Sequence, residues 1–165
     1  MVNKIKTARQ TALAVLEAVF SEGAYSNIAL NQALLEVPLS SADKGLVTEI
    51  VYGTVARKIT LEWYLSHVIE DRDKLDSWLY FLLLMSLYQI LYLDKIPAHA
   101  VVNEAVELAK KYGGREDAPF VNGLLGAVSR NMQKEGTSQN AEDVSEKTVE
   151  DGNAAVTEES CDAGK

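Results

Sequence analysis

The segment from Trp78 to Leu93, WLYFLLLMSLYQILYL, is an almost uninterrupted apolar run in which Ser86 and Gln89 are the only strongly polar residues. A helix that crosses a membrane needs roughly 20 apolar residues. This run has sixteen residues and is bracketed by Asp76 and Asp94. It therefore predicts a helix that is buried on nearly all sides inside a helical domain, with Asp76 as its N-cap.

Apolar residues elsewhere in the chain recur at three- and four-residue spacing, which is typical of amphipathic helices. The first of these helices is expected to begin near Asn3 and to end at Gly23, because a glycine suits a left-handed cap. The last one is expected to begin at Pro119 and to direct Phe120 inward. No alternating strand pattern of useful length appears, so the sequence predicts an all-α fold.

The middle of the chain predicts a helix that Ser40 or Ser41 caps and whose inward stripe runs from Leu46 to Ile59, followed by a new helix that Thr60 caps. Gly53 lies within the first of these two helices. Because glycine has no side chain, it allows another helix to approach closely. Gly53 therefore predicts a tight helix contact.

The acidic charge of the chain is concentrated near its C-terminal end. The formal net charge is −8, and residues 136–165 contain eight acidic and two basic residues. This stretch has no aromatic residue and too little apolar surface to offset the entropy of ordering. We expect a folded domain over residues 1–135 and a disordered acidic tail over residues 136–165. The tail is either a plain solvated extension or an acidic arm that competes with nucleic acid.

Four blocks of sequence resemble a known family: Gly23–Asn31, Asp43–Thr54, Ile96–Lys111 and Phe120–Gly123. Together they resemble the NusB fold. They are most similar to the RNA-binding N-terminal domain of the Sun/RsmB family of ribosomal RNA cytosine-5 methyltransferases. The resemblance implies an all-α bundle of about seven helices, arranged as two packed sub-bundles around the apolar helix.

Catalysis is not expected of this chain. In the resembled family, methyl transfer belongs to a separate α/β domain that binds S-adenosylmethionine and supplies reactive cysteines. This chain has no Gly-x-Gly motif, and its single cysteine, Cys161, lies in the acidic tail. His67 and His99 are too few and too separated for a metal site. We therefore expect no enzyme activity, cofactor or metal. The lone cysteine and the absence of a secretion signal predict a cytoplasmic protein without a membrane segment.

Seven basic residues are the candidates for RNA contact. In NusB-like domains the N-terminal helix contributes a basic face to RNA, and here three cations precede the first acid of that helix, Glu17. Other cations lie at helix junctions and ends. The full set is Lys4, Lys6, Arg9, Arg57, Lys58, Arg130 and Lys134. The competing interpretation is that they are solubilising surface charges, and RNA binding requires the fold to bring them to one side.

Asn103, Glu104 and Asn122 resemble polar signature positions of the family. They either satisfy backbone groups at buried helix junctions or line the groove that receives RNA. We favour the structural interpretation, because these residues lie within apolar runs that are typical of a core.

The resemblance implies an RNA-binding accessory domain that positions ribosomal RNA for a methyltransferase domain absent from this chain. One alternative is a free-standing NusB-type antitermination factor that binds RNA together with a ribosomal protein, and Phe120–Gly123 fits it well. The spacing of Gly23–Asn31 and Leu46–Thr60 follows the methyltransferase family more closely. A second alternative is a bundle that binds only other proteins. The oligomeric state is not determined by the sequence.

Overall fold

A computed structural model describes residues 7–134 of the chain. It divides into two units, Met1–Ala127 and Val128–Lys165, and each unit is described by itself. The first unit contains α1 (Ala8–Ser21), α2 (Ser26–Glu36), α3 (Ser41–Ala56), α4 (Lys58–Ser66), the 3₁₀ turn η1 (Arg72–Lys74), α5 (Ser77–Tyr92) and α6 (Ala98–Tyr112). Residues 117–127, here called the Pro119 helix, are also helical, as are residues 128–134 of the second unit.

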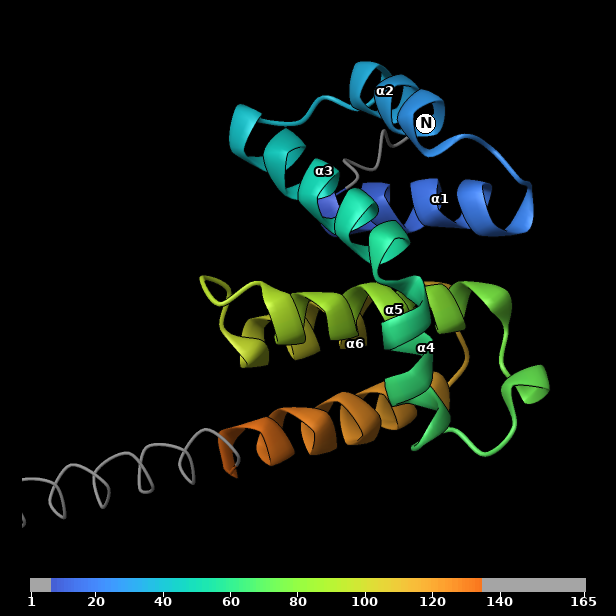
Figure 1. Ribbon diagram of the computed structural model, residues 1–165, viewed down its shortest axis with the longest axis vertical. Helices are drawn as coiled ribbons and strands as arrows, with labels where there is room; N and C mark the ends of the chain where they lie inside the picture. The colour runs from blue at the N-terminus through green and yellow to red at the C-terminus, as the bar shows by residue number, and fades with distance from the viewer. Residues whose placement is uncertain (1–6, 135–165) are drawn as a thin grey trace, which may run out of the picture. The chain divides into compact units, whose positions relative to one another are not determined.

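The helices of the first unit form two packed sub-bundles (Figure 1). Helices α1, α2 and α3 pack on one another, and α5 packs against α4 and α6. Helix α5 also contacts α1 and α3, so it joins the two groups. Helices α1 to α6 and the Pro119 helix confirm the predicted all-α bundle of seven helices, and residues 7–134 contain no strand.

Helix α5 is the core of the first unit. Every residue from Leu79 to Gln89 is buried. A helix that is apolar on all sides must be surrounded by other helices, and α5 is in contact with four of them. Asp76 takes the predicted N-cap position, although its side chain makes no capping hydrogen bond. Within residues 7–134, no helix has the length and apolar character that crossing a membrane requires.

Gly53 lies where α3 packs against α5. A Cβ atom at this position would overlap the ring of Tyr88, a side chain on α5 that is only 6% exposed. The predicted tight contact is therefore confirmed.

The start of α1 differs from the prediction. Thr7 is the N-cap and forms a capping box with Gln10. The Thr7 hydroxyl accepts a hydrogen bond from the Gln10 amide at 3.3 Å, and the Gln10 side-chain oxygen accepts one from the Thr7 amide at 3.0 Å. The capping box sets the start of the helix at Ala8 rather than near Asn3. At the other end, Gly23 has φ 73°, as predicted for a left-handed cap.

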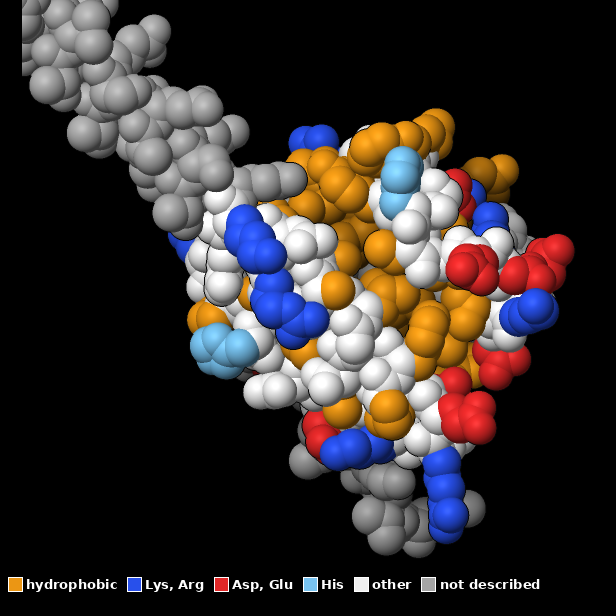
Figure 2. All heavy atoms as spheres, turned by 90° about the horizontal axis from the view of Figure 1, so that it is seen from below, with side chains coloured by type: hydrophobic (Ala, Val, Ile, Leu, Met, Phe, Trp, Pro, Cys, Tyr) orange, Lys and Arg blue, Asp and Glu red, His pale blue; other side chains and the backbone are white. Residues whose placement is uncertain are grey.

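The junction between α3 and α4 was also predicted incorrectly. Arg57 is the N-cap of α4, so Thr60 lies inside the helix and does not cap it. Ile59 is 84% exposed instead of facing inward. The break at Arg57 starts a new helix with a new buried face, which Leu61 and Leu65 provide. Figure 2 shows hydrophobic side chains gathered on one surface of the molecule.

Phe120 was likewise expected in the core but is 38% exposed. The buried face of the Pro119 helix is provided by other residues, namely Ala118, Val121, Leu124 and Leu125. The helix is already formed at residue 117, two residues before Pro119. The predicted acidic tail, its boundary at residue 136 and Cys161 lie outside the described residues.

Candidate nucleic-acid interface

Arg9 joins three helices near the start of α1. Its Nε donates a hydrogen bond to Oε1 of Gln89 on α5 at 2.7 Å, and its Nη1 lies 3.6 Å from Oε1 of Glu104 on α6. The side chain of Arg9 is 13% exposed, whereas Gln89 is fully buried. The Gln89 amide nitrogen in turn donates to the Met85 carbonyl at 3.1 Å. The Arg9 guanidinium therefore satisfies buried polar groups inside the domain.

The next residue of α1 reaches the end of α6. The Gln10 side-chain nitrogen donates to the Tyr112 hydroxyl at 3.3 Å. Tyr112 is half exposed, and its ring centroid lies 6.3 Å from that of Trp78, at the start of α5. The first turn of α1, the last turn of α6 and the first turn of α5 therefore meet at one end of the domain.

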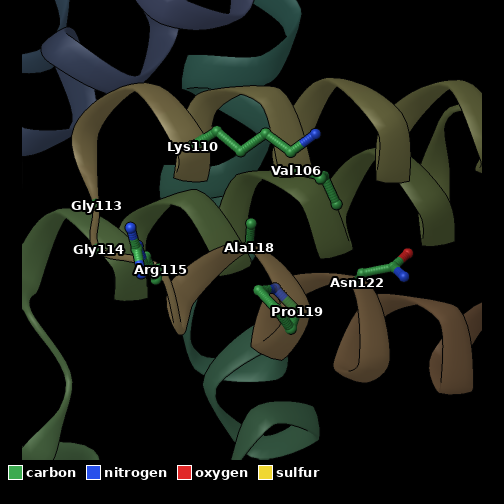
Figure 3. A pocket seen from close by; sticks show the side chains of 8 residues that line it. All are labelled: Val106, Lys110, Gly113, Gly114, Arg115, Ala118, Pro119 and Asn122. Carbon is green, nitrogen blue, oxygen red and sulfur yellow. The ribbon is translucent and has the colours of Figure 1, made fainter.

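An open pocket lies where α6 turns into the Pro119 helix (Figure 3). Its volume is about 580 Å³, and its lining consists of Val106, Lys110, Gly113, Gly114, Arg115, Ala118, Pro119 and Asn122. The turn is fixed by a hydrogen bond of 2.6 Å from the Gly114 amide to the Asp117 carboxylate. We call this hollow the Lys110 pocket.

The Lys110 pocket combines apolar walls with cations. Figure 3 shows Lys110 extending along one side of the hollow and Arg115 at its other end. Lys110 lies 3.2 Å from Glu107, a pair in which both side chains are exposed. Arg115 is exposed and makes no ion pair within residues 7–134. A Cβ at Gly113 would overlap the Asp117 carboxylate, so this tight turn requires glycine there.

The asparagines predicted to satisfy buried helix junctions do not do so. Asn103 and Asn122 are exposed, and Asn122 lines the Lys110 pocket. The structural interpretation is therefore wrong for both, because they lie on the outer faces of amphipathic helices rather than in the core. Glu104 contacts a side chain rather than a backbone group, since its carboxylate lies 3.6 Å from the Arg9 guanidinium.

The other predicted cations do not form one patch with Arg9. Lys58 lies 3.3 Å from Glu62 and 5.3 Å from the ring centroid of Phe20, near the last turn of α1. Phe20 and Arg9 are separated by roughly 16 Å along α1, at 1.5 Å per residue. Lys58 and Arg9 therefore face opposite ends of the same helix.

Arg57 stacks on an aromatic pair of α5. Its guanidinium lies 4.2 Å above the Tyr92 ring, which stacks on Tyr88 with centroids 5.4 Å apart. The Tyr88 hydroxyl donates to Glu49 at 3.4 Å. Burial raises the pKa of Tyr88, and the Glu49 carboxylate raises it further. Arg57 therefore covers a packed aromatic surface.

The remaining predicted cations are not located relative to the pocket. Lys4 and Lys6 lie outside the described residues. Arg130 and Lys134 belong to the second unit, where both side chains are exposed. Sequence reasoning missed Lys110 and Arg115. The available signal was a cluster of cations on both sides of Gly113–Gly114, at the end of one helix and the start of another.

Within residues 7–134, no group of three or more His, Cys, Asp and Glu side chains is arranged to hold a metal ion. The fold and the pocket thus define an all-α domain with a cation-rimmed hollow between two helices. The sequence model of the NusB family matches residues 6–130, and the chain belongs to this family.

Two relatives differ in how much of their length the chain covers. The probable ribosomal RNA small subunit methyltransferase B of Bacillus subtilis is 42% identical over 133 residues, which cover 81% of this chain and 29% of that protein. The transcription antitermination protein NusB of Ruminiclostridium cellulolyticum is 34% identical over 143 residues, which cover 84% of this chain and 97% of that protein. The chain thus spans less than a third of the first relative.

A solved structure has the same fold. A chain in the crystal structure of the antitermination factors NusB and NusE in complex with dsRNA superposes with a TM-score of 0.69 at 21% identity. The match covers 79% of this chain and 99% of that chain.

Proposed function

We propose that this chain is an RNA-binding domain that contacts RNA at the Lys110 pocket and through the cations that precede α1. The observation that carries this proposal is the convergence of three helix ends at one place, which the Gln10–Tyr112 hydrogen bond of 3.3 Å secures. The Lys110 pocket lies directly after Tyr112 in the chain.

The pocket offers the groups that single-stranded RNA requires. Lys110 and Arg115 supply positive charge for phosphates, which dominate nucleic-acid affinity. Val106, Ala118 and Pro119 provide apolar surface for an unstacked base, and the exposed Asn122 amide has both donors and an acceptor for a base edge.

The cations predicted from the sequence take different parts in this proposal. Lys4 and Lys6 precede Thr7 in the sequence, and their contribution to RNA binding remains a prediction. Arg9 acts by holding α1 in place. Arg57 and Lys58 contribute at most a separate patch, and the roles of Arg130 and Lys134 remain predictions.

The 42% identity to a ribosomal RNA methyltransferase supports ribosomal RNA as the ligand and an accessory role in its methylation in the cytoplasm. In this proposal the chain positions the RNA. Methyl transfer and S-adenosylmethionine binding belong to a separate catalytic domain that the sequence of this chain does not contain. The whole-length match to NusB of Ruminiclostridium cellulolyticum supports the alternative, a free-standing antitermination factor. A pull-down separates the two: a ribosomal-protein partner favours the antitermination factor, and ribosomal RNA alone favours the accessory domain.

The test is the salt dependence of binding to a single-stranded ribosomal RNA fragment. If about four phosphates are neutralised, log affinity should fall with log salt at a slope near −3, since each phosphate contributes roughly −0.7. The double variant Lys110→Gln/Arg115→Gln should bind more weakly, and its slope should be smaller in magnitude by about 1.4.

The matched control is Lys44→Gln/Lys95→Gln, which removes two exposed cations away from the pocket. It should keep the slope of the unmodified chain. A slope near zero for the unmodified chain, or equal losses in the two double variants, would contradict the proposal.

A further inference from the structure

Helix α4 exposes an apolar surface that the RNA proposal does not use. We call Ile59, Trp63, Tyr64 and Val68 the α4 stripe. Their exposed fractions are 84%, 58%, 42% and 48%, respectively. Ile59 and Trp63 are four residues apart within α4, so they lie on one side of the helix, whereas Val68 follows the end of α4 at Ser66. Figure 2 shows a patch of exposed hydrophobic side chains on one face of the molecule.

The aromatic centre of the α4 stripe is ordered by its neighbours. The Trp63 ring packs edge-on against Tyr64 with centroids 5.0 Å apart, and the His67 ring lies 4.4 Å from it. The Trp63 carbonyl accepts a hydrogen bond of 2.6 Å from the Ser66 hydroxyl and lies 2.7 Å from His67 Nδ1. A preorganised aromatic side chain loses little entropy on binding, which suits an interface anchor.

Three of the cations near the α4 stripe are already paired, whereas Arg57, the N-cap of α4, stacks on Tyr92 and makes no ion pair within residues 7–134. Lys58 and Arg72 both approach Oε1 of Glu62, at 3.3 Å and 3.6 Å. Lys74 lies 3.3 Å from Asp71. These three cations are therefore neutralised by carboxylates of the same surface.

Three exposed acids in the segment that follows the α4 stripe have no such partner, and this segment contacts α4 through the Arg72–Glu62 ion pair of 3.6 Å. Glu70, Asp73 and Asp76 follow Val68 in the chain, and none of them makes an ion pair within residues 7–134. Figure 2 shows Asp and Glu side chains clustered beside the hydrophobic patch. The surface is thus an apolar stripe with an acidic rim.

We propose that the α4 stripe is the docking site for a basic amphipathic helix of a partner protein. The apolar face of that helix covers Trp63 and Ile59, and its Lys and Arg side chains meet Glu70, Asp73 and Asp76. Charge complementarity of this kind selects a partner and orients it. The inference is independent of the RNA site.

Charge disfavours the other occupants. RNA would bring phosphates against the acidic rim. A second copy of the chain, which carries a net charge of −8, would place two acidic rims together. Residues 136–165 of the same chain are themselves strongly acidic.

The test uses the full chain and an 18-residue helical peptide of Leu and Lys with one apolar face, labelled for fluorescence anisotropy. The double variant Ile59→Ser/Trp63→Ser should weaken peptide binding tenfold or more. The matched control Leu35→Ser removes an 88% exposed leucine from α2 and should bind normally. Replacing every Lys of the peptide by Glu should abolish binding.

The double variant Glu70→Gln/Asp73→Asn tests the acidic rim. Its matched control is Glu17→Gln/Glu22→Gln, which removes two acids at α1 and its C-cap. Only the first double variant should weaken peptide binding. Far-UV circular dichroism checks folding, and Ile59→Ser alone serves if the double variant does not fold. Unchanged peptide binding in the stripe variants, or equal loss in Leu35→Ser, would overturn the proposal. It would also be overturned if the stripe variants lost RNA binding or a self-association seen by sedimentation.

Discussion

Arg9 and Arg115 show that the role of a cation depends on what surrounds it. The Arg9 side chain is 13% exposed, and its Nε donates a hydrogen bond of 2.7 Å to the fully buried Gln89. Its guanidinium is therefore engaged inside the domain. Arg115 is exposed at the rim of an open pocket and makes no ion pair within residues 7–134. The sequence singled out Arg9 and not Arg115, but of the two only Arg115 has a guanidinium available to phosphate.

Substitution of Arg9 by methionine should therefore reduce stability. It removes the donor to Gln89 Oε1 and leaves a buried acceptor unsatisfied, which costs about 1–3 kcal/mol. Urea unfolding followed by circular dichroism measures the change. Glu17→Met, an exposed substitution on the same helix, should stay within about 0.5 kcal/mol of the unmodified chain. Equal stability of the two variants would show that the Arg9–Gln89 contact does not hold the helices together.

Helix α3 contains two glycines that serve different purposes. Gly53 lies against the Tyr88 ring, whereas a Cβ at Gly45 would meet no atom within 4 Å. Intrinsic helix propensity favours alanine at both positions. Packing against α5 reverses this preference only at Gly53, because Tyr88 is buried and has little room to move.

The substitutions Gly53→Ala and Gly45→Ala should consequently change stability in opposite directions. Gly53→Ala overpacks the α3–α5 contact and should lower the free energy of unfolding by about 1–3 kcal/mol. Gly45→Ala should raise it by up to about 1 kcal/mol, since the substitution reduces the freedom of the unfolded chain. Denaturant titrations of both variants measure the difference. A gain in stability for Gly53→Ala would mean that the Tyr88 ring relaxes freely.

For the molecule as a whole, RNA binding by a chain of net charge −8 requires charge separation. Residues 136–165 carry eight acids, while residues 1–135 have a net charge of only −2. The cations of the Lys110 pocket therefore act locally against a repulsive background that salt can screen.

Replacing the eight acids of residues 136–165 by their amides should raise RNA affinity several-fold at low salt. The increase should disappear at about 1 M salt, where the Debye length is about 3 Å. Titrations of both chains with the same RNA fragment at several salt concentrations give the comparison. An increase that persists at high salt would indicate a contact other than charge repulsion.

The sequence by itself determined the helical class, the buried helix of residues 78–93, the cap at Gly23 and the tight contact at Gly53. Each of these follows from a local property: apolar composition, spacing, or the missing side chain of glycine. The family resemblance added the arrangement in two sub-bundles. The start of α1 was missed because the sequence offers other possible caps besides Thr7, and the start of α4 was missed because Arg57 begins it without a side-chain cap.

Only the tertiary structure decided which polar and apolar residues are available for binding. Arg9, Asn103, Asn122, Ile59 and Phe120 were all assigned to the wrong environment or left ambiguous by periodicity. An apolar stripe in the sequence indicates that one face of a helix is buried. The width of that buried face, and which charged side chains are paired, depend on the neighbouring helices. The Lys110 pocket depends on the meeting of α6 with the Pro119 helix, and a contact of this kind is fixed by packing rather than by local sequence.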